Sequence, residues 1–215
     1  MVTLALECSG KSASIAIYDG EKPLAFTMEN AGRTHAETLM PMVDYVLSAT
    51  GKTLDGVDKI AVTIGPGAFT GLRVGVATAI GLALGANIPI APVSTMEALA
   101  HQAFSTAREG EVICTASDAR REQVYNALFA VQGGNLVRLI DDRAIGIEDL
   151  LADMPQDVHY VLIGDGAHLI TSPNHDFIRL SPHLTLPNAH GVALATQHIT
   201  GIDPCDVTPN YIRTP

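Results

Sequence analysis

Apolar and polar residues alternate in short runs at the start of the chain. In residues 12–18, Ala13, Ile15 and Ile17 alternate with Ser12, Ser14, Ala16 and Tyr18, which is the period of a strand. The neighbouring apolar runs at residues 2–6 and 23–28 have the length of strands, and a hairpin turn at Asp19-Gly20 separates the second run from the third. The pattern predicts a β-meander of three strands.

The period then changes to that of a helix. Thr34 and Glu37 hold the two positions of a capping box, and Gly51 ends the apolar periodicity. We therefore expect a helix over residues 35–50, bent at Pro41. The remaining elements predicted in this half are strands at 59–64 and 88–93 and helices at 71–84 and 95–104, which gives the order βββαβαβα.

A polar stretch at residues 105–111 marks a boundary between two halves. The second half repeats the predicted order of the first with fewer elements. Its strands are predicted at 112–117, 123–131, 135–140 and 160–163, and its helices at 147–154 and 189–199. An antiparallel start followed by alternating helices and strands is typical of an α/β fold. We predict two similar α/β lobes, one over residues 1–104 and a reduced one over residues 111–215.

The most distinctive segment joins the fourth strand to the second helix and reads Gly65-Pro66-Gly67-Ala68-Phe69-Thr70-Gly71-Leu72-Arg73-Val74-Gly75. A glycine-rich turn that opens a helix can bind phosphate through its backbone N–H groups. The spacing matches neither the GxxxxGK[ST] loop nor the GxGxxG loop. The glycines are equally compatible with a tight turn that packs closely against its neighbours, and both interpretations stay open.

The helix after this turn carries small residues in two rows, one formed by Gly71, Gly75, Ala79 and Ala83 and the other by Ala77, Gly81 and Gly85. Such rows let another backbone approach a helix closely. An apolar ridge lies beside them, made of Leu72, Val76, Ile80 and Leu84. A helix that is apolar all round is buried in the chain's own core, or a partner covers one of its faces.

Composition narrows the classes of function. Hydrophobic residues make up 47% of the 215 residues and charged residues 17%, which is typical of a folded globular protein. The net charge of −10 and only 13 Lys and Arg residues argue against a nucleic-acid surface. Three widely spaced cysteines indicate neither a disulfide framework nor a zinc site, and the N-terminus lacks the pattern of a signal peptide. We expect a cytoplasmic protein without a membrane segment.

Further blocks keep a constant order along nearly the whole chain: Leu4-Ala5-Leu6-Glu7-Cys8-Ser9, Arg33-Thr34-His35, Asn87-Ile88-Pro89, Val93-Ser94-Thr95-Met96-Glu97-Ala98-Leu99, Asp118-Ala119-Arg120-Arg121 and Pro209-Asn210-Tyr211-Ile212-Arg213. Together with the specific glycine-rich block, they resemble the bacterial TsaB (YeaZ) family. The resemblance implies two lobes of the actin-like ATPase superfamily. It also implies a TsaD-like catalytic partner and a TsaE-like ATPase subunit, and a joint role in attaching a threonylcarbamoyl group to N6 of adenosine 37 in tRNA.

The residues offer no catalytic site of their own. In the TsaD relatives, the resemblance implies, an HxxxH motif holds a metal; its two ends align with Thr95 and Leu99, and neither side chain can replace an imidazole. The family usually shows Asp-Thr-Ser where this chain has Glu7-Cys8-Ser9, so a carboxylate remains at the first phosphate loop. The residues expected nearest to a phosphate are Glu7, Gly67, Thr70 and Gly71. We expect no metal and no tightly bound cofactor, and ATP or ADP only at an interface with the partner.

Three functions are compatible with the sequence. The favoured one is a noncatalytic subunit that docks on the homologous TsaD-like enzyme and activates it, with tRNA contacted only through the complex. The second is a nucleotide-dependent kinase or carbamoyltransferase, which requires tight ATP binding by this chain alone. The third is a peptidase acting on the partner, for which the sequence offers no assembled nucleophile or metal site.

Docking is predicted to use the helices at 35–50 and 71–84, packed side by side against two equivalent helices of the partner. Without a partner, the same apolar face would form a homodimer. The residues expected at this contact are Leu39, Val43, Val46, Leu72, Val76 and Ile80, with Arg73 as an anchoring charge. Periodicity does not decide which of them face the partner and which the core. A charge at an exposed position, for example Val76→Glu, should abolish the complex and leave the fold intact, whereas loss of folding would assign that residue to the core.

Overall fold

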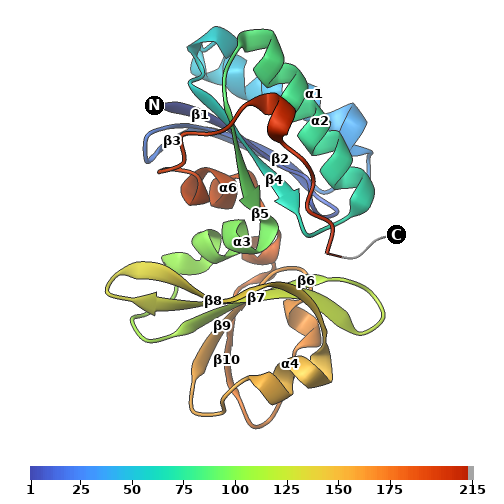
Figure 1. The fold of residues 1–215 in the computed structure, drawn as a ribbon, viewed down its shortest axis with the longest axis vertical. Coiled ribbons are helices and arrows are strands. Elements are labelled where there is room, and N and C mark those ends of the chain that lie inside the picture. The colour runs from blue at the N-terminus through green and yellow to red at the C-terminus, as the bar shows by residue number, and fades with distance from the viewer. Residues whose placement is uncertain (213–215) are drawn as a thin grey trace.

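The computed structural model describes residues 1–212, so Arg213 of the last sequence block lies outside them. Two five-stranded sheets lie one above the other in Figure 1, with helix α3 (Thr95–Phe104) between them. The first sheet has the strand order β3-β2-β1-β4-β5, and the second has the order β10-β9-β6-β7-β8. The predicted α/β fold of two lobes is confirmed.

The first sheet consists of β1 (Val2–Glu7), β2 (Ala13–Asp19), β3 (Lys22–Glu29), β4 (Lys59–Gly65) and β5 (Ile90–Ser94). β1, β2 and β3 pair in antiparallel fashion, whereas β4 and β5 are parallel to β1. The predicted meander and the order βββαβαβα are therefore present. Helices α1 (His35–Thr50) and α2 (Phe69–Ala86) follow β3 and β4, and α1 continues through Pro41.

The second sheet consists of β6 (Val112–Asp118), β7 (Gln123–Gln132), β8 (Asn135–Gly146), β9 (His159–Ile163) and β10 (Asp176–Arg179). The helices in this half of the chain are α4 (Ile147–Asp153), α5 (Pro182–Thr185) and α6 (Ala189–Ala195). β8 continues past the predicted end at residue 140 because Ile145 and Ala144 still pair with β7. β10 and α5 are too short to carry a periodic signal, and they were not predicted.

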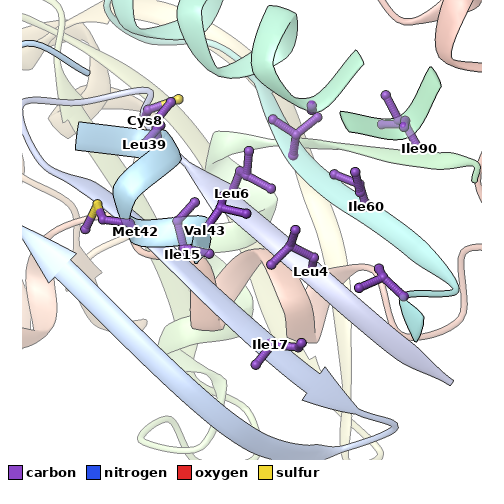
Figure 2. Packing of buried hydrophobic residues seen from close by; sticks show 14 of the residues in the cluster. Leu4, Leu6, Cys8, Ile15, Ile17, Leu39, Met42, Val43, Ile60 and Ile90 are labelled. Atoms are coloured by element: carbon purple, nitrogen blue, oxygen red, sulfur yellow. The ribbon is translucent and has the colours of Figure 1, made fainter. Parts of the chain in front are cut away.

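Large and small side chains alternate along β1, so the two faces of the first sheet differ in the size of their residues. Leu4 and Leu6 belong to a core cluster with the inner residues of α1 and α2, and Figure 2 shows Leu39 and Val43 of α1 lying over this face. Each buried side chain of this kind stabilises the fold by roughly 1.5–3 kcal/mol. The side of the sheet that carries α1 and α2 is thus the one with the large aliphatic residues.

The opposite face of the first sheet is lined by alanines, and α6 packs against it. The small residues Ala5, Ala16, Ala61 and Ala91 cluster there with Val192 of α6. The sequence placed residues 111–215 in the second lobe, whereas this helix returns to the first. Alanine rows allow a helix to approach a sheet closely, which local periodicity does not reveal.

α6 ends at Ala195, before the predicted end at residue 199, because the next backbone carbonyls have another partner. The buried Lys59 of β4 donates from Nζ to Thr196 O at 2.5 Å and to Ile199 O at 2.7 Å. At the other end, the N–H of Ala189 donates to the hydroxyl of Ser14 on β2 at 2.9 Å. These bonds fix both ends of α6 to the first lobe.

Candidate functional site

α1 and α2 cover the same face of the first sheet and contact each other, as predicted (Figure 1). The capping box of α1 is confirmed, with the N–H of Thr34 donating to Glu37 Oε2 at 3.1 Å. His35, the first residue of α1, contacts the loop after β1, since its Nε2 lies 3.0 Å from Gly10 O. Both helices are therefore firmly held on the sheet.

The structure places most of the expected docking residues in the core beneath these helices. Leu39, Val43, Val46 and Leu72 are at most 1% exposed and Val76 is 3% exposed, whereas Ile80 is half-buried and Arg73 is exposed. The first five cannot be offered to a partner by the folded chain. They are the residues of α1 and α2 that point at the sheet, so their contribution is to hold the two helices in place.

The two rows of small residues on α2 face opposite directions. A Cβ at Gly71 would collide with Cys8 O, and a Cβ at Gly75 would collide with Cys8 Sγ, so the inner row receives the end of β1. A Cβ at Gly81 or Gly85 would meet nothing within 4 Å. The outer row is therefore open, and a second backbone can approach it.

The exposed side of α1 and α2 forms what we name the outer helical face, defined by Met40, Asp44, Tyr45, Arg73, Ala77, Gly81, Leu84 and Gly85. Three of its side chains are large and apolar, with exposed fractions of 43% for Met40, 59% for Tyr45 and 55% for Leu84. Large apolar groups gathered on two neighbouring helices are typical of a protein contact. The sequence could find them as members of the apolar pattern, but it could not separate them from the core.

Among the described residues, α2 is the one helix long and apolar enough to cross a membrane by length and composition. Its inner side packs on β4 and α1. A helix that covers a sheet has the same composition, so the apolar character of α2 is explained by this packing and by the outer helical face.

A second candidate region is a small cavity of about 170 Å³ between the lobes, lined by Ser9, Gly10, Lys11, Gly67 and Ala68 from the first lobe and by Ser117, Asp118, Ala119, Arg120, Tyr125 and Asp165 from the second. Of the residues expected near a phosphate, Gly67 lines it. Glu7, Thr70 and Gly71 do not. Ligand pockets usually measure roughly 300–1,000 Å³, so this cavity is smaller than a typical ligand pocket.

The glycine-rich turn is packed against the loop after β1. The N–H of Ala68 donates to Ser9 O at 2.6 Å, and a Cβ at Gly67 would lie 2.8 Å from the Cβ of Ser9. A backbone donor that a phosphate would need is therefore already bound. Close packing explains Gly67 and Gly71, which is the second of the two interpretations of this turn.

Glu7 lies beneath the cavity and is 1% exposed. Its Oε1 accepts hydrogen bonds from the N–H of Ser9 at 2.6 Å and from the Ser9 hydroxyl at 2.5 Å. Burial raises the pKa of Glu7 above its ordinary value, and Ser9, Thr63 and His35 oppose this rise without cancelling it. A carboxyl held in this way supports the turn and is not presented to a ligand.

The second-lobe side of the cavity is a pair of loops that bind each other. The N–H of Asp118 donates to Asp165 Oδ1 at 3.1 Å, and the N–H of Arg120 donates to Asp118 Oδ1 at 2.7 Å. Arg120, Arg121 and Glu122 all adopt left-handed backbone conformations, with φ of 65°, 54° and 57°. The sequence missed Lys11, Ser117, Tyr125 and Asp165 as lining residues; the Gly164-Asp165-Gly166 turn was the available signal for the last.

The two positions that align with metal-binding histidines lie on α3, one helical turn apart. Thr95 and Leu99 are both 0% exposed, and Leu99 packs in the cluster that joins α3 to the second sheet. Within residues 1–212, no group of three or more His, Cys, Asp or Glu side chains is placed to hold a metal ion. The residues present at the aligned positions therefore do not fit a metal.

Two lobes, each built on a mixed five-stranded sheet and joined through α3, define the class of two-lobed actin-like proteins. The ethanolamine utilization protein EutJ from Carboxydothermus hydrogenoformans shares this fold, with a TM-score of 0.59 at 12% identity over 91% of this chain and 90% of that one. The family model described as TsaD, tRNA N6-adenosine threonylcarbamoyltransferase, matches residues 26–200.

Within this class, the chain belongs to the TsaB (YeaZ) family. The tRNA threonylcarbamoyladenosine biosynthesis protein TsaB of Buchnera aphidicola is 30% identical over 179 residues, which cover 80% of this chain and 82% of the relative. TsaB of Haemophilus influenzae is 42% identical over 126 residues, 58% of this chain. The crystal structure of a Pseudomonas aeruginosa protein, described as similar to peptidase YEAZ, superposes with a TM-score of 0.83 at 26% identity over 99% of both chains.

Two of these sequence matches cover little more than half of the relative's length. The matched segment spans 52% of the Haemophilus influenzae protein and 55% of the Escherichia coli TsaB. These matches are confined to part of each protein, whereas the structural likeness extends over the whole chain.

Proposed function

We propose that this protein is a noncatalytic subunit in threonylcarbamoyladenosine biosynthesis, which docks on a TsaD-like enzyme and activates it for modification of adenosine 37 in tRNA. Membership of the TsaB family supports the process. The outer helical face supports the mode of action, because it is the place where large apolar side chains and an open row of small residues occur together.

The observation that carries the proposal is the outward row of Ala77, Gly81 and Gly85 on α2. In a helix that only covers a sheet, the solvent side is normally polar. Here the solvent side of α2 has a row without bulk and an exposed Leu84, and the neighbouring α1 exposes Met40 and Tyr45. Small residues facing outward permit a partner helix to lie close against α2, and the flanking apolar groups then bury their surface against it.

The alternative of a nucleotide-dependent kinase or carbamoyltransferase has less support. The cavity between the lobes measures about 170 Å³. The N–H of Ala68 already donates to Ser9 O, and the Glu7 carboxyl is buried. Thr95 and Leu99 supply no metal ligand comparable to imidazole. We therefore assign no catalytic step to this chain, and we place any ATP or ADP at an interface with the partner.

The outer helical face also suggests how the partners assemble with this protein. A TsaD-like subunit would contact α1 and α2 through equivalent helices, and the chain alone would use this face to form a homodimer. A TsaE-like ATPase and tRNA would join through the complex, since a net charge of −10 is unsuited to direct binding of tRNA. We place the complex in the cytoplasm.

The test is transfer of a threonylcarbamoyl group to tRNA by purified TsaD-like and TsaE-like subunits, with this protein omitted, added, or added as Ala77→Glu. Ala77 is exposed at the first position of the outer row, so we expect the variant to keep its fold and lose docking. Ala152→Glu, at an exposed position of α4, is the matched control. We expect activity with the wild type and the control, and background activity with Ala77→Glu.

Two results would contradict the proposal. The first is ATP turnover or tRNA modification by this protein alone. The second is full activity with Ala77→Glu at stoichiometric concentration, which would show that the outer helical face is not used.

A further inference from the structure

Arg73 is the single charged residue in the sequence of α2 and belongs to the outer helical face. It lies one turn after the start of the helix, ahead of Ala77, Gly81 and Leu84 along the same exposed side. A long cationic side chain on a helix that is otherwise uncharged is costly to bury without an opposite charge. Its surroundings therefore indicate what a partner must supply.

The guanidinium of Arg73 is held in one place by two aromatic side chains. Its central carbon lies 3.8 Å from the centroid of the Phe69 ring and 6.0 Å from that of Tyr211. Nε donates a hydrogen bond to the Tyr211 hydroxyl at 3.1 Å, and the two ring centroids are 4.9 Å apart. An arginine fixed before binding loses less conformational freedom when a partner arrives.

Tyr211 reaches this position because the C-terminal segment is fastened to the first lobe. Val207 is buried in the core cluster, and the N–H of Asn210 donates to Ile64 O at 2.6 Å. Gly65 lacks the Cβ that would collide with Asn210 O. The segment next to α2 in Figure 1 thus brings the Tyr211 hydroxyl to the side chain of Arg73.

Arg73 is one of the described arginines that form no ion pair. Carboxylates lie within ion-pair distance of Arg33, Arg120, Arg138 and Arg143. Over residues 1–212, no such carboxylate pairs with Arg73, and its hydrogen bond uses Nε alone. The terminal nitrogens Nη1 and Nη2 keep the forked geometry that receives a carboxylate in two parallel hydrogen bonds.

We propose that Arg73 is the recognition cation of the outer helical face and takes a carboxylate of the TsaD-like subunit, with Tyr211 as its positioning residue. This inference rests on the proposed function. The partner it fits presents an apolar helical surface with one Asp or Glu opposite the start of α2. A fixed arginine without an ion pair also favours an acidic position of the partner over a basic one.

The experiment is titration calorimetry of the full chain into the TsaD-like subunit. Arg73→Gln removes the charge, Arg73→Lys keeps the charge without the fork, and Tyr211→Phe removes the hydroxyl acceptor. Arg108→Gln, at an exposed position outside the outer helical face, is the matched control. We expect Arg73→Gln to weaken binding by about 30-fold or more, Arg73→Lys and Tyr211→Phe to weaken it less, and Arg108→Gln to leave it unchanged.

A role of Tyr211 through Arg73 has two further signatures. Tyr211→Phe should cause no additional loss in an Arg73→Gln background, because the positioned group is already gone. In the free wild-type chain, the Nε–H resonance of Arg73 should be visible by NMR and exchange slowly, and Tyr211→Phe should broaden it. Unchanged melting temperatures for both single variants show that the fold is intact.

The outcomes separate this inference from the proposed function. If Arg73→Gln binds like the wild type while Ala77→Glu does not bind, the inference is wrong and the docking face stands. If Arg73→Gln weakens only the homodimer, the carboxylate belongs to a second copy of this chain and the assignment to the TsaD-like subunit is overturned. If the wild type does not bind the TsaD-like subunit at all, the proposed function itself fails.

Discussion

At the scale of single residues, Gly75 and Gly81 lie in the same helix with opposite surroundings. A Cβ at position 75 would run into Cys8 Sγ, whereas one at position 81 would meet nothing within 4 Å. We expect Gly75→Ala to lower the free energy of unfolding by about 1–3 kcal/mol through overpacking. Gly81→Ala should raise it by about 0.5–1 kcal/mol, because alanine favours the helix.

Chemical denaturation of the two variants measures this difference. Adding Cys8→Ala is the control, since it removes the sulfur that the new methyl group meets, and the cost of Gly75→Ala should then shrink. An equal cost with and without Cys8 would show that the close contact with β1 does not decide the identity of residue 75.

The buried carboxyl of Glu7 gives a second expectation at this scale. Burial raises its pKa in the folded chain above the ordinary value of 4.5, so the folded state binds this proton more tightly than the unfolded state. Its contribution to stability is complete below pH 4.5 and is lost as the pH rises through the raised pKa. Glu7→Gln should remove this loss, because Gln Oε1 can still accept from Ser9.

The measurement is the free energy of unfolding from pH 4 to 8 for the wild type and Glu7→Gln. The difference between the two curves isolates this group from the other acidic residues. A difference that stays constant with pH, or that favours the wild type increasingly as the pH rises, would show that the pKa of Glu7 is not raised.

At the scale of elements, α1 and α2 each have one side in the core and one side exposed to solvent. Val76 and Ala77 are adjacent on α2, but Val76 is 3% exposed and Ala77 is exposed. We expect Val76→Glu to destabilise the fold by about 3 kcal/mol or more, because it buries an unpaired charge. Ala77→Glu should change stability by less than about 0.5 kcal/mol.

Thermal unfolding followed by circular dichroism compares these neighbours directly. The pair also separates the two roles of α2, since only a residue of the outer helical face can lose docking without losing the fold. Equal destabilisation by both substitutions would show that Ala77 lies in the core and that the row of Ala77, Gly81 and Gly85 is not open to solvent.

At the scale of the whole molecule, the two lobes are held together by an ionic network as well as by α3. Arg138 of β8 donates to Glu97 of α3 at 3.0 Å and to Asp142 at 2.6 Å, and the Ser94 hydroxyl at the start of α3 donates to Asp142. The guanidinium also lies 4.5 Å from the centroid of the Phe129 ring. The network joins the N-terminus of α3 to the edge of the second sheet.

We expect Arg138→Met to loosen this connection, so that one cooperative unfolding transition becomes broader or separates into two. Scanning calorimetry measures this as a calorimetric enthalpy that exceeds the van't Hoff enthalpy. Arg143→Met is the control, because Arg143 pairs with Asp153 inside the second lobe, at 2.7 Å. If the transitions separate equally in both variants, the ionic network around Arg138 does not hold the two lobes together.

The sequence predicted most of the fold because its signals are local. The meander follows from alternation and a hairpin turn, and the start of α1 follows from Thr34 and Glu37. The sequence did not predict the path of α6 back to the first sheet, since this path depends on alanines in four separate strands and on Lys59. These residues form a common surface only once the strands lie side by side, so no local sequence pattern reveals it.

The sequence predicted that α1 and α2 pack side by side, but it did not separate their exposed side chains from their buried ones. Leu39, Val43, Val46, Leu72 and Val76 stood out because they are apolar, and the structure buries them for the same reason. Met40, Tyr45 and Leu84 are apolar and exposed, a distinction that periodicity cannot make on a helix that is apolar over most of its circumference. The contact of Arg73 with Tyr211 joins residues far apart in sequence and has no local signal.

Hydrogen exchange of this protein, alone and mixed with the TsaD-like subunit, tests the central claim most directly. We expect complex formation to slow exchange in α1, in α2 and in the C-terminal segment around Tyr211, with little change at the loops of Ser9, Asp118 and Asp165. Protection of those cavity loops by ATP alone, with α1 and α2 unchanged in the mixture, would contradict the account and place the function between the lobes.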